Sequence, residues 1–200
     1  MFLTAGETYT TQKYRSSLPQ RFRIVMAGGK NLSHWQVFSQ YDTEWGALKY
    51  GRTNTMAASA CGVLSSVNAV YALNGQFMDP MEVAAYAVKT GYRVEGSGTD
   101  YRFVQAAAKH FGKKYGYAFA GSTYNLSTFT RHLQNGGTAV VYVPHHYICV
   151  ADYKDGKYLV LDPYATAARK TSPFGCWVSG SRFQSGTLRS QNYLLLKATN

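Results

Sequence analysis

A cysteine at the start of an apolar helix is the residue of this chain best placed to act as a nucleophile. Cys61 follows a run of small residues, 57–60, and an apolar pattern after it predicts a helix to about Leu73, before the stop signal Asn74-Gly75. The unpaired N–H groups and the dipole of a helix N-terminus favour thiolate over thiol, which makes such a sulfur nucleophilic. The alternative is that Cys61 is one more buried small side chain, as most free cysteines are.

A cysteine nucleophile needs a neighbouring base, and that base needs a group to orient it. His110 and His132 fall late in predicted helices of mixed polarity, where histidines are commonly solvated or interact with the helix C-terminus. His146 instead begins a predicted core strand, which would hold the imidazole in a fixed orientation. We therefore take His146 as the candidate base, against the alternative of a core histidine with satisfied hydrogen bonds.

Few carboxylates follow His146 in the sequence. Asp152 is six residues further along the same predicted strand, about 20 Å away at the usual rise per residue. Asp155 falls in the following turn and is more distant still. Asp162 ends the returning strand, which brings it back beside His146. Asp162 is thus the candidate for orienting the imidazole.

The turn between these two strands decides whether His146 and Asp162 can meet. A two-residue turn, 155–156, would leave them on opposite faces of the hairpin. A three-residue loop, 154–156, pairs Ile148 with Asp162 and puts His146 on the same face as Asp162. We expect the three-residue loop.

The order of predicted elements favours an α+β fold in one domain, residues 1–200. Within it, 1–50 is a loop-rich arm packed over the domain, 51–135 is a helical part, and 136–200 is an antiparallel sheet part. The expected helices cover 61–73, 80–90, 99–110 and 126–133, and the expected strands cover 22–26, 114–120, 138–143, 146–153, 158–162 and 193–197.

The composition is strongly basic. Lysine and arginine number 21 against 10 aspartates and glutamates, for a net charge of +11. Such a surface attracts anionic polymers, and an anionic cell-surface polymer is one expected partner. The basic residues are scattered with no recognisable binding motif, which argues against nucleic acid. Seventeen tyrosines with few charges are typical of surfaces that bind peptides or glycans.

No cofactor, metal or disulfide is expected. The three cysteines, Cys61, Cys149 and Cys176, are an odd number without paired spacing, and we expect Cys149 in the core and Cys176 partly exposed. There is no HExxH motif, and the adjacent His145 and His146 would point to opposite faces of a strand. No stretch of about 18 apolar residues is present, so we expect a soluble protein. Residues 1–11 lack the charged start and apolar middle of a secretory signal, which leaves the localisation open.

Three motifs in this order resemble a known family. They are "QYDTEW" at 40–45, "ACG" at 60–62 and "HHYICVADYKDGKYLVLDP" at 145–163. Together they resemble the papain-like cysteine peptidases related to the bacteriocin leader peptidases, which cut after a double glycine. The chain differs from the family pattern at Ala60, at 63–64 and at His145, where the family has glycine, Pro-Thr and glycine.

The resemblance implies a papain-like fold, in which the helix that carries the nucleophile packs against the sheet that carries the base. It implies that Cys61 is the nucleophile, His146 the general base and acid, and Asp162 the group that orients His146. The backbone N–H of Cys61 would help to stabilise the oxyanion. The second donor in such enzymes is a glutamine about six residues before the cysteine, where this chain has Thr55.

We therefore expect a bacterial cysteine peptidase, secreted or at the cell surface, that hydrolyses peptides or proteins through a thioester intermediate. A cytoplasmic location stays open. Two alternatives stay open as well: an amidase or acyltransferase that acts on cell-wall peptides, and a catalytically inactive binding module on a peptidase-like scaffold. A plain structural domain would leave the order of cysteine, histidine and aspartate as a coincidence.

Overall fold

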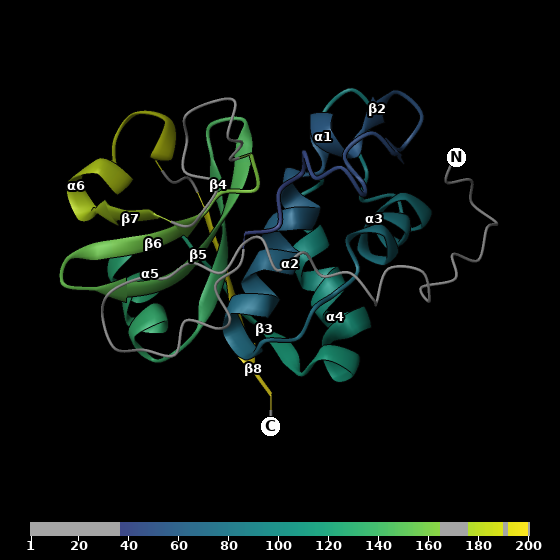
Figure 1. Ribbon diagram of the computed structural model, residues 1–200. Coiled ribbons are helices and arrows are strands. Elements are labelled where there is room, and N and C mark those ends of the chain that lie inside the picture. The colour runs from purple at the N-terminus through teal and green to yellow at the C-terminus, as the bar shows by residue number, and fades with distance from the viewer. Residues whose placement is uncertain (1–36, 165–175, 190–191, 200) are drawn as a thin grey trace.

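A six-stranded antiparallel sheet carries helices on both of its faces (Figure 1). The structure is a computed structural model that describes residues 37–164, 176–189 and 192–199. The strands lie in the order β3-β8-β4-β5-β6-β7. Their bounds are β3 (Tyr117–Thr123), β4 (Thr138–Val143), β5 (His146–Lys154), β6 (Lys157–Leu161), β7 (Cys176–Ser179) and β8 (Asn192–Ala198). The expected α+β fold class is confirmed.

The helices divide into two layers, one on each face of the sheet. The first layer contains α1 (Met56–Ser59), α2 (Cys61–Asn74), α3 (Pro80–Lys89) and α4 (Phe103–Tyr115). The second contains α5 (Leu126–Gln134) and the short α6 (Gly180–Phe183), whose Phe129, Leu133 and Phe183 pack on the sheet. A small hairpin, β1 (Lys49–Tyr50) with β2 (Asn54–Thr55), precedes α1, and a 3₁₀ turn, η5 (Gly186–Leu188), precedes β8.

Helix α2 is the centre of the first layer. Residues 62–70 are all buried, because the sheet covers one side of the helix and α3 and α4 cover the other (Figure 1). The helix begins at Cys61, as expected, and ends one residue beyond Leu73, where Gly75 adopts the left-handed conformation at φ 76°. The expected packing of the cysteine helix on an antiparallel sheet is therefore confirmed.

The segment from 37 to 50 packs over α2. The side chain of Asn68 accepts a hydrogen bond from Phe38 N at 2.7 Å and donates one to Phe38 O at 3.1 Å. Both groups are buried, so this pair of bonds satisfies a backbone segment that would otherwise lose its hydration without replacement. The side chains of Val37, Phe38 and Trp45 join the core beside α2.

The β5–β6 hairpin differs from the expectation at its turn. Its turn has two residues, Asp155 and Gly156, with φ of 50° and 74°, so Lys154 pairs with Lys157 and the expected three-residue loop is wrong. A bulge at Ala151 then shifts the register by one residue, and Val150 pairs with Val160. Beyond the bulge the pairing is the one that we expected, which continues toward Ile148 opposite Asp162.

The number of residues between the paired Val150 and Val160 explains both results. Nine residues, 151–159, separate them, and an odd number cannot be divided into a straight ladder and a two-residue turn. The extra residue must lie either in a longer turn or in a bulge. Asp155 is of a type that tolerates the left-handed region, which makes the shorter turn available and places the extra residue at Ala151.

Several other boundaries were misplaced. Helix α4 begins at Phe103 rather than at Thr99, and it continues through Gly112 to a left-handed Gly116, so β3 starts three residues later than expected. Gly112 is retained inside the helix because its α-carbon faces the carbonyl oxygen of Tyr117 at close range. The sequence signals missed β7 and α6, and the expected strand at 22–26 lies outside the described residues.

Candidate active site

Three elements meet at one end of the sheet and bring together Cys61, His146 and Asp162. Cys61 is the first residue of α2, His146 is the first residue of β5, and Asp162 directly follows the last residue of β6. His146 Nε2 lies 2.7 Å from Asp162 Oδ1, and the imidazole is also hydrogen-bonded to the Cys61 side chain. Since Nε2 faces the carboxylate, Nδ1 is the nitrogen left for the thiol.

The surroundings of His146 favour its charged form. Burial opposes an imidazolium, but the hydrogen bonds to Asp162 and Cys61 and the negative charges of those groups outweigh it. Together they raise the pKa of His146 to about 9. The histidine is therefore protonated at neutral pH and can act as a proton donor.

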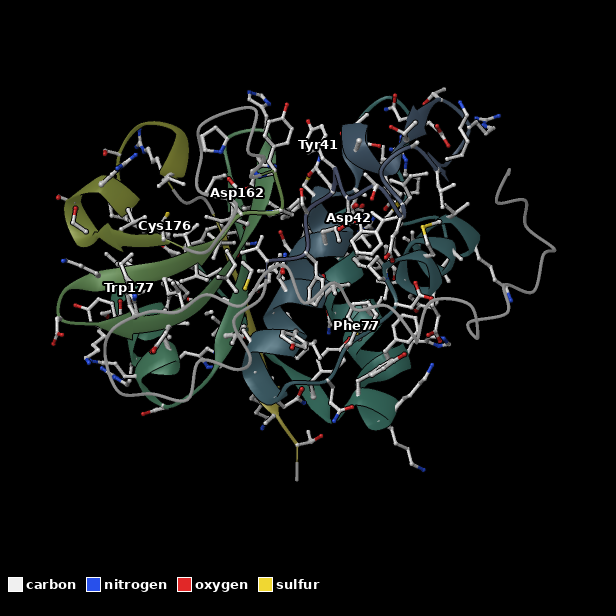
Figure 2. The ribbon with its side chains drawn as sticks, in the orientation of Figure 1. Tyr41, Asp42, Phe77, Asp162, Cys176 and Trp177 are labelled. Carbon is white, nitrogen blue, oxygen red and sulfur yellow. The ribbon has the colours of Figure 1, made fainter. Side chains whose placement is uncertain are left out.

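Aromatic side chains and one backbone contact hold the His146–Asp162 pair. The backbone N–H of Tyr164 donates to Asp162 Oδ1 at 2.9 Å, and the ring of Tyr164 meets that of His146 edge to face at 5.6 Å. Tyr41 packs edge to face on Tyr164 at 5.0 Å. Figure 2 shows Tyr41 and Asp162 at the same end of the molecule, with Cys176 on β7 beyond them.

Cys61 and His146 line a cavity of about 820 Å³ that opens to solvent. One wall comes from the loop between α3 and α4, residues 94 and 96–101, and the other from the ends of the strands, including Tyr142, Tyr147 and Asn192. Its volume lies within the usual range for small-molecule and peptide sites. The thiol is thus positioned where a ligand can reach it.

Gln40 is a polar residue of this cavity that the sequence interpretation did not select. Its side chain is 2% exposed, its Nε2 donates to Ala57 O, and its backbone N–H donates to Pro163 O at 2.8 Å. Gln40 therefore bridges the residue after Asp162 to α1, directly before the cysteine helix. The "QYDTEW" motif starts at Gln40 and could have identified this residue. The family spacing of about six residues before the cysteine led us to Thr55 as the second oxyanion donor instead.

Thr55 lies elsewhere. It is the N-cap of α1, pairs with Lys49 in the small hairpin, and accepts a hydrogen bond from the Ser59 hydroxyl through its carbonyl. It is not among the residues that line the cavity. The structure thus brings Cys61, His146 and Asp162 together with Gln40, and leaves Thr55 outside.

The two other cysteines lie where we expected them. Cys149 is fully buried on the face of the sheet that α2 covers, and burial raises the pKa of its thiol. Cys176 is exposed at the start of β7. No group of three or more histidine, cysteine or acidic side chains within the described residues is arranged to hold a metal ion. No helix in the same part of the chain is long and apolar enough to cross a membrane.

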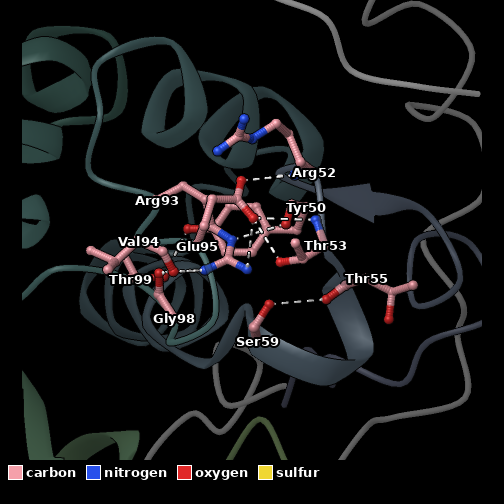
Figure 3. A network of polar contacts seen from close by, with 10 residues as sticks. All are labelled: Tyr50, Arg52, Thr53, Thr55, Ser59, Arg93, Val94, Glu95, Gly98 and Thr99. Carbon is pink, nitrogen blue, oxygen red and sulfur yellow. Dashed lines mark hydrogen bonds and ion pairs between the residues drawn. The ribbon is translucent and has the colours of Figure 1, made fainter.

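A buried arginine shapes the cavity wall opposite the sheet (Figure 3). Arg93 Nε donates to Tyr50 O at 2.9 Å, and its Nη1 donates to the carbonyls of Val94 and Gly98. Its guanidinium also lies 4.9 Å from the centre of the Tyr50 ring and forms an ion pair with Glu95. These contacts attach the loop that carries residues 94–101 to the β1–β2 hairpin.

Thr99 connects this loop to the cysteine helix. Its hydroxyl is 2.8 Å from the Tyr50 hydroxyl, and its side chain lies against the α-carbon of Gly62, the residue directly after Cys61. A β-carbon on Gly62 would be 2.8 Å from Thr99 Cβ, closer than such atoms can approach. The absence of a side chain at residue 62 therefore lets the cavity wall approach Cys61.

Sequence comparisons with known proteins do not identify a family for this chain. No protein-family model matches the chain, and no curated protein matches it. Among solved structures, it is similar to a crystal structure of a double glycine motif protease from an AMS/PCAT transporter in complex with the leader peptide. The TM-score is 0.44 and the identity 16%, over 70% of this chain and 85% of that one. At this level the likeness carries no functional inference, so the chemistry of the chain has to follow from its own residues.

The contact of Gly62 with Thr99 leads to a stability prediction. Gly62→Ala should lower the free energy of unfolding by about 1–3 kcal/mol, because the added methyl group overpacks a buried contact. Urea denaturation measures the change. Gly180→Ala is the matched control, since a β-carbon there would lie at an ordinary contact distance of 3.5 Å from Gly156 O. A Gly62→Ala variant as stable as the wild type would contradict the close packing of Thr99.

Proposed function

We propose that this chain is a cysteine peptidase that hydrolyses peptide bonds with Cys61 as nucleophile, His146 as acid and base, and Asp162 as the orienting carboxylate. The observation that carries the proposal is the position of His146. It is hydrogen-bonded to both Asp162 and Cys61 on the wall of a solvent-open cavity, and its raised pKa suits a thiolate–imidazolium pair.

In the first half of the reaction, the Cys61 thiolate attacks the carbonyl carbon of the peptide bond and forms a carbon–sulfur bond. The protonated His146 gives its proton to the leaving nitrogen, the carbon–nitrogen bond breaks, and the amine departs. A thioester to Cys61 remains. In the second half, His146 takes a proton from water, the resulting hydroxide attacks the thioester, and the carboxylic acid leaves as the thiolate is regenerated.

Two donors suit the oxyanion that forms in both halves. The backbone N–H of Cys61 lies in the first turn of α2, where amides have no partner within the helix. Gln40 lines the same cavity, and its side-chain NH₂ group, which donates one hydrogen to Ala57 O, has a second hydrogen to donate. We assign the second donor to Gln40 rather than to Thr55, because Gln40 borders the cavity and Thr55 does not.

The reactivity of the thiol tests the proposal. Iodoacetamide should alkylate Cys61 rapidly below about pH 6, far below the range in which an ordinary thiol reacts, and His146→Ala should slow that labelling. Mass spectrometry resolves the three cysteines, so buried Cys149 and exposed Cys176 are controls within the same chain. Labelling of Cys61 no faster than that of Cys176, and unchanged by His146→Ala, would favour a binding module without catalysis.

The pKa of His146 leads to a pH prediction. Because the folded pKa is raised above its ordinary value, the imidazolium persists through neutral pH and is lost as the pH rises through about 9. Asp162→Asn removes a negative charge that favours the imidazolium, so the titration should move to lower pH. NMR titration of the His146 ring proton, assigned with His146→Gln, measures both midpoints. An unchanged midpoint in Asp162→Asn would contradict the role of Asp162.

The role of Gln40 can be separated from that of the thiol. Gln40→Ala should reduce hydrolysis of fluorescein-labelled casein by about 10²–10³-fold, as the loss of one oxyanion donor does elsewhere. The rate of iodoacetamide alkylation at Cys61 should stay the same, because that reaction forms no oxyanion. Thr55→Ala is the matched control and should hydrolyse casein at the wild-type rate. Equal loss in the two variants, or loss of alkylation in Gln40→Ala, would refute the assignment.

A further inference from the structure

The walls of the cavity carry the exposed large hydrophobic side chains of the described residues. These side chains are Val94, Tyr101 and Tyr124, with exposed fractions of 42%, 56% and 78%. All three line the cavity that contains Cys61. Exposed apolar side chains that gather on one concave surface mark a binding site more often than scattered ones do.

A second aromatic group lies on the opposite wall, next to the catalytic histidine. Tyr147 directly follows His146, and its ring centre is 5.0 Å from that of Tyr142. Tyr142 is paired with Asn192 across the sheet, and all three residues line the cavity. Burial, together with the nearby charge of Cys61, raises the pKa of Tyr147, so its hydroxyl stays uncharged.

The cavity contrasts with the rest of this basic chain in its charge. None of the lysines and arginines of residues 37–164, 176–189 and 192–199 lines it. The one carboxylate among its described lining residues is that of Asp100, which accepts hydrogen bonds from Arg102 Nε at 3.0 Å and Nη2 at 2.7 Å. The carboxylate on the described walls therefore already has a cationic partner, and the other titratable residues there are Cys61, His145, His146 and the tyrosines.

This arrangement favours one class of substrate side chain. A lysine, arginine or carboxylate that entered between the tyrosines would lose hydration and meet no unpaired carboxylate, lysine or arginine in return. An aromatic side chain would bury apolar surface there and contact the tyrosine rings. Because Tyr147 adjoins His146, such a side chain would lie within about two residues of the bond that is cleaved.

We propose that this cleft selects peptides with an uncharged aromatic side chain close to the scissile bond, held between Tyr101 on one wall and Tyr142 and Tyr147 on the other. The inference rests on the proposed peptidase function and names the substrate that this function uses. It assigns the tyrosine-rich cavity to specificity, and it places the many basic residues of the described chain outside substrate selection.

Covalent probes can test the selectivity without knowledge of the natural substrate. Two series of acetylated dipeptidyl acyloxymethyl ketones, Ac-X-Ala and Ac-Ala-X, carry phenylalanine, tyrosine, glycine, lysine or glutamate as X. The second-order rate of Cys61 alkylation is measured for each and divided by the rate with iodoacetamide. In at least one series, the aromatic probes should react about tenfold or more faster than the glycine, lysine and glutamate probes.

Two tyrosine variants test whether the selectivity comes from the side chains of the cleft. Tyr101→Ala and Tyr142→Ala should each reduce the advantage of the aromatic probes and leave the iodoacetamide rate at Cys61 unchanged. Tyr153→Ala is the matched control, since Tyr153 lies near the opposite end of β5 from His146 and should keep the full preference.

The outcomes separate the two proposals. If iodoacetamide labels Cys61 rapidly, but a lysine, glutamate or glycine ketone alkylates it as fast as the aromatic ketones do, the aromatic selectivity alone is overturned. An aromatic preference that survives both tyrosine variants also overturns it. Slow labelling of Cys61 by iodoacetamide and by every ketone overturns the peptidase function and, with it, the selectivity.

Discussion

The burial of α2 on all sides is the constraint on which the rest of this structure depends. Because residues 62–70 contact the sheet on one side and helices on the other, the helix can neither slide nor rotate without opening a cavity in the core. Its first residue, Cys61, is thereby held at the end of the sheet where β5 begins and β6 ends. The apolar core thus determines the position of the proposed nucleophile.

Two sets of hydrogen bonds, one made by Gln40 and one by Arg93, attach the surrounding loops to this buried helix. On one side, Gln40 bonds both to the residue after Asp162 and to α1. On the other side, Arg93 donates hydrogen bonds to three backbone carbonyls, two in the wall of the cavity and one in the β1–β2 hairpin. A buried arginine with this many acceptors is well satisfied, and removal of any one acceptor would be costly. The two walls are therefore as well defined as the helix between them.

The sequence predicted the parts of this site that depend on local signals. A cysteine before an apolar run, a histidine at the start of a β-rich run and a carboxylate at the end of the next one identified Cys61, His146 and Asp162. Gln40 could not be found in this way, because its position follows from hydrogen bonds to residues far along the chain. The helix start predicted at Thr99 was wrong for a related reason: the hydrogen-bond partner of Thr99, Tyr50, is 49 residues away.

The bulge at Ala151 gives the hairpin a freedom that a regular ladder lacks. In a regular ladder, the spacing between two facing residues can change during evolution only in steps of two, since one added residue turns a strand over. A bulge absorbs a single residue, and its deletion would restore the regular ladder with the same facing pairs. Relatives of this chain can therefore differ by one residue between the histidine and the aspartate and keep the same contact, and alignments should allow a gap at this point.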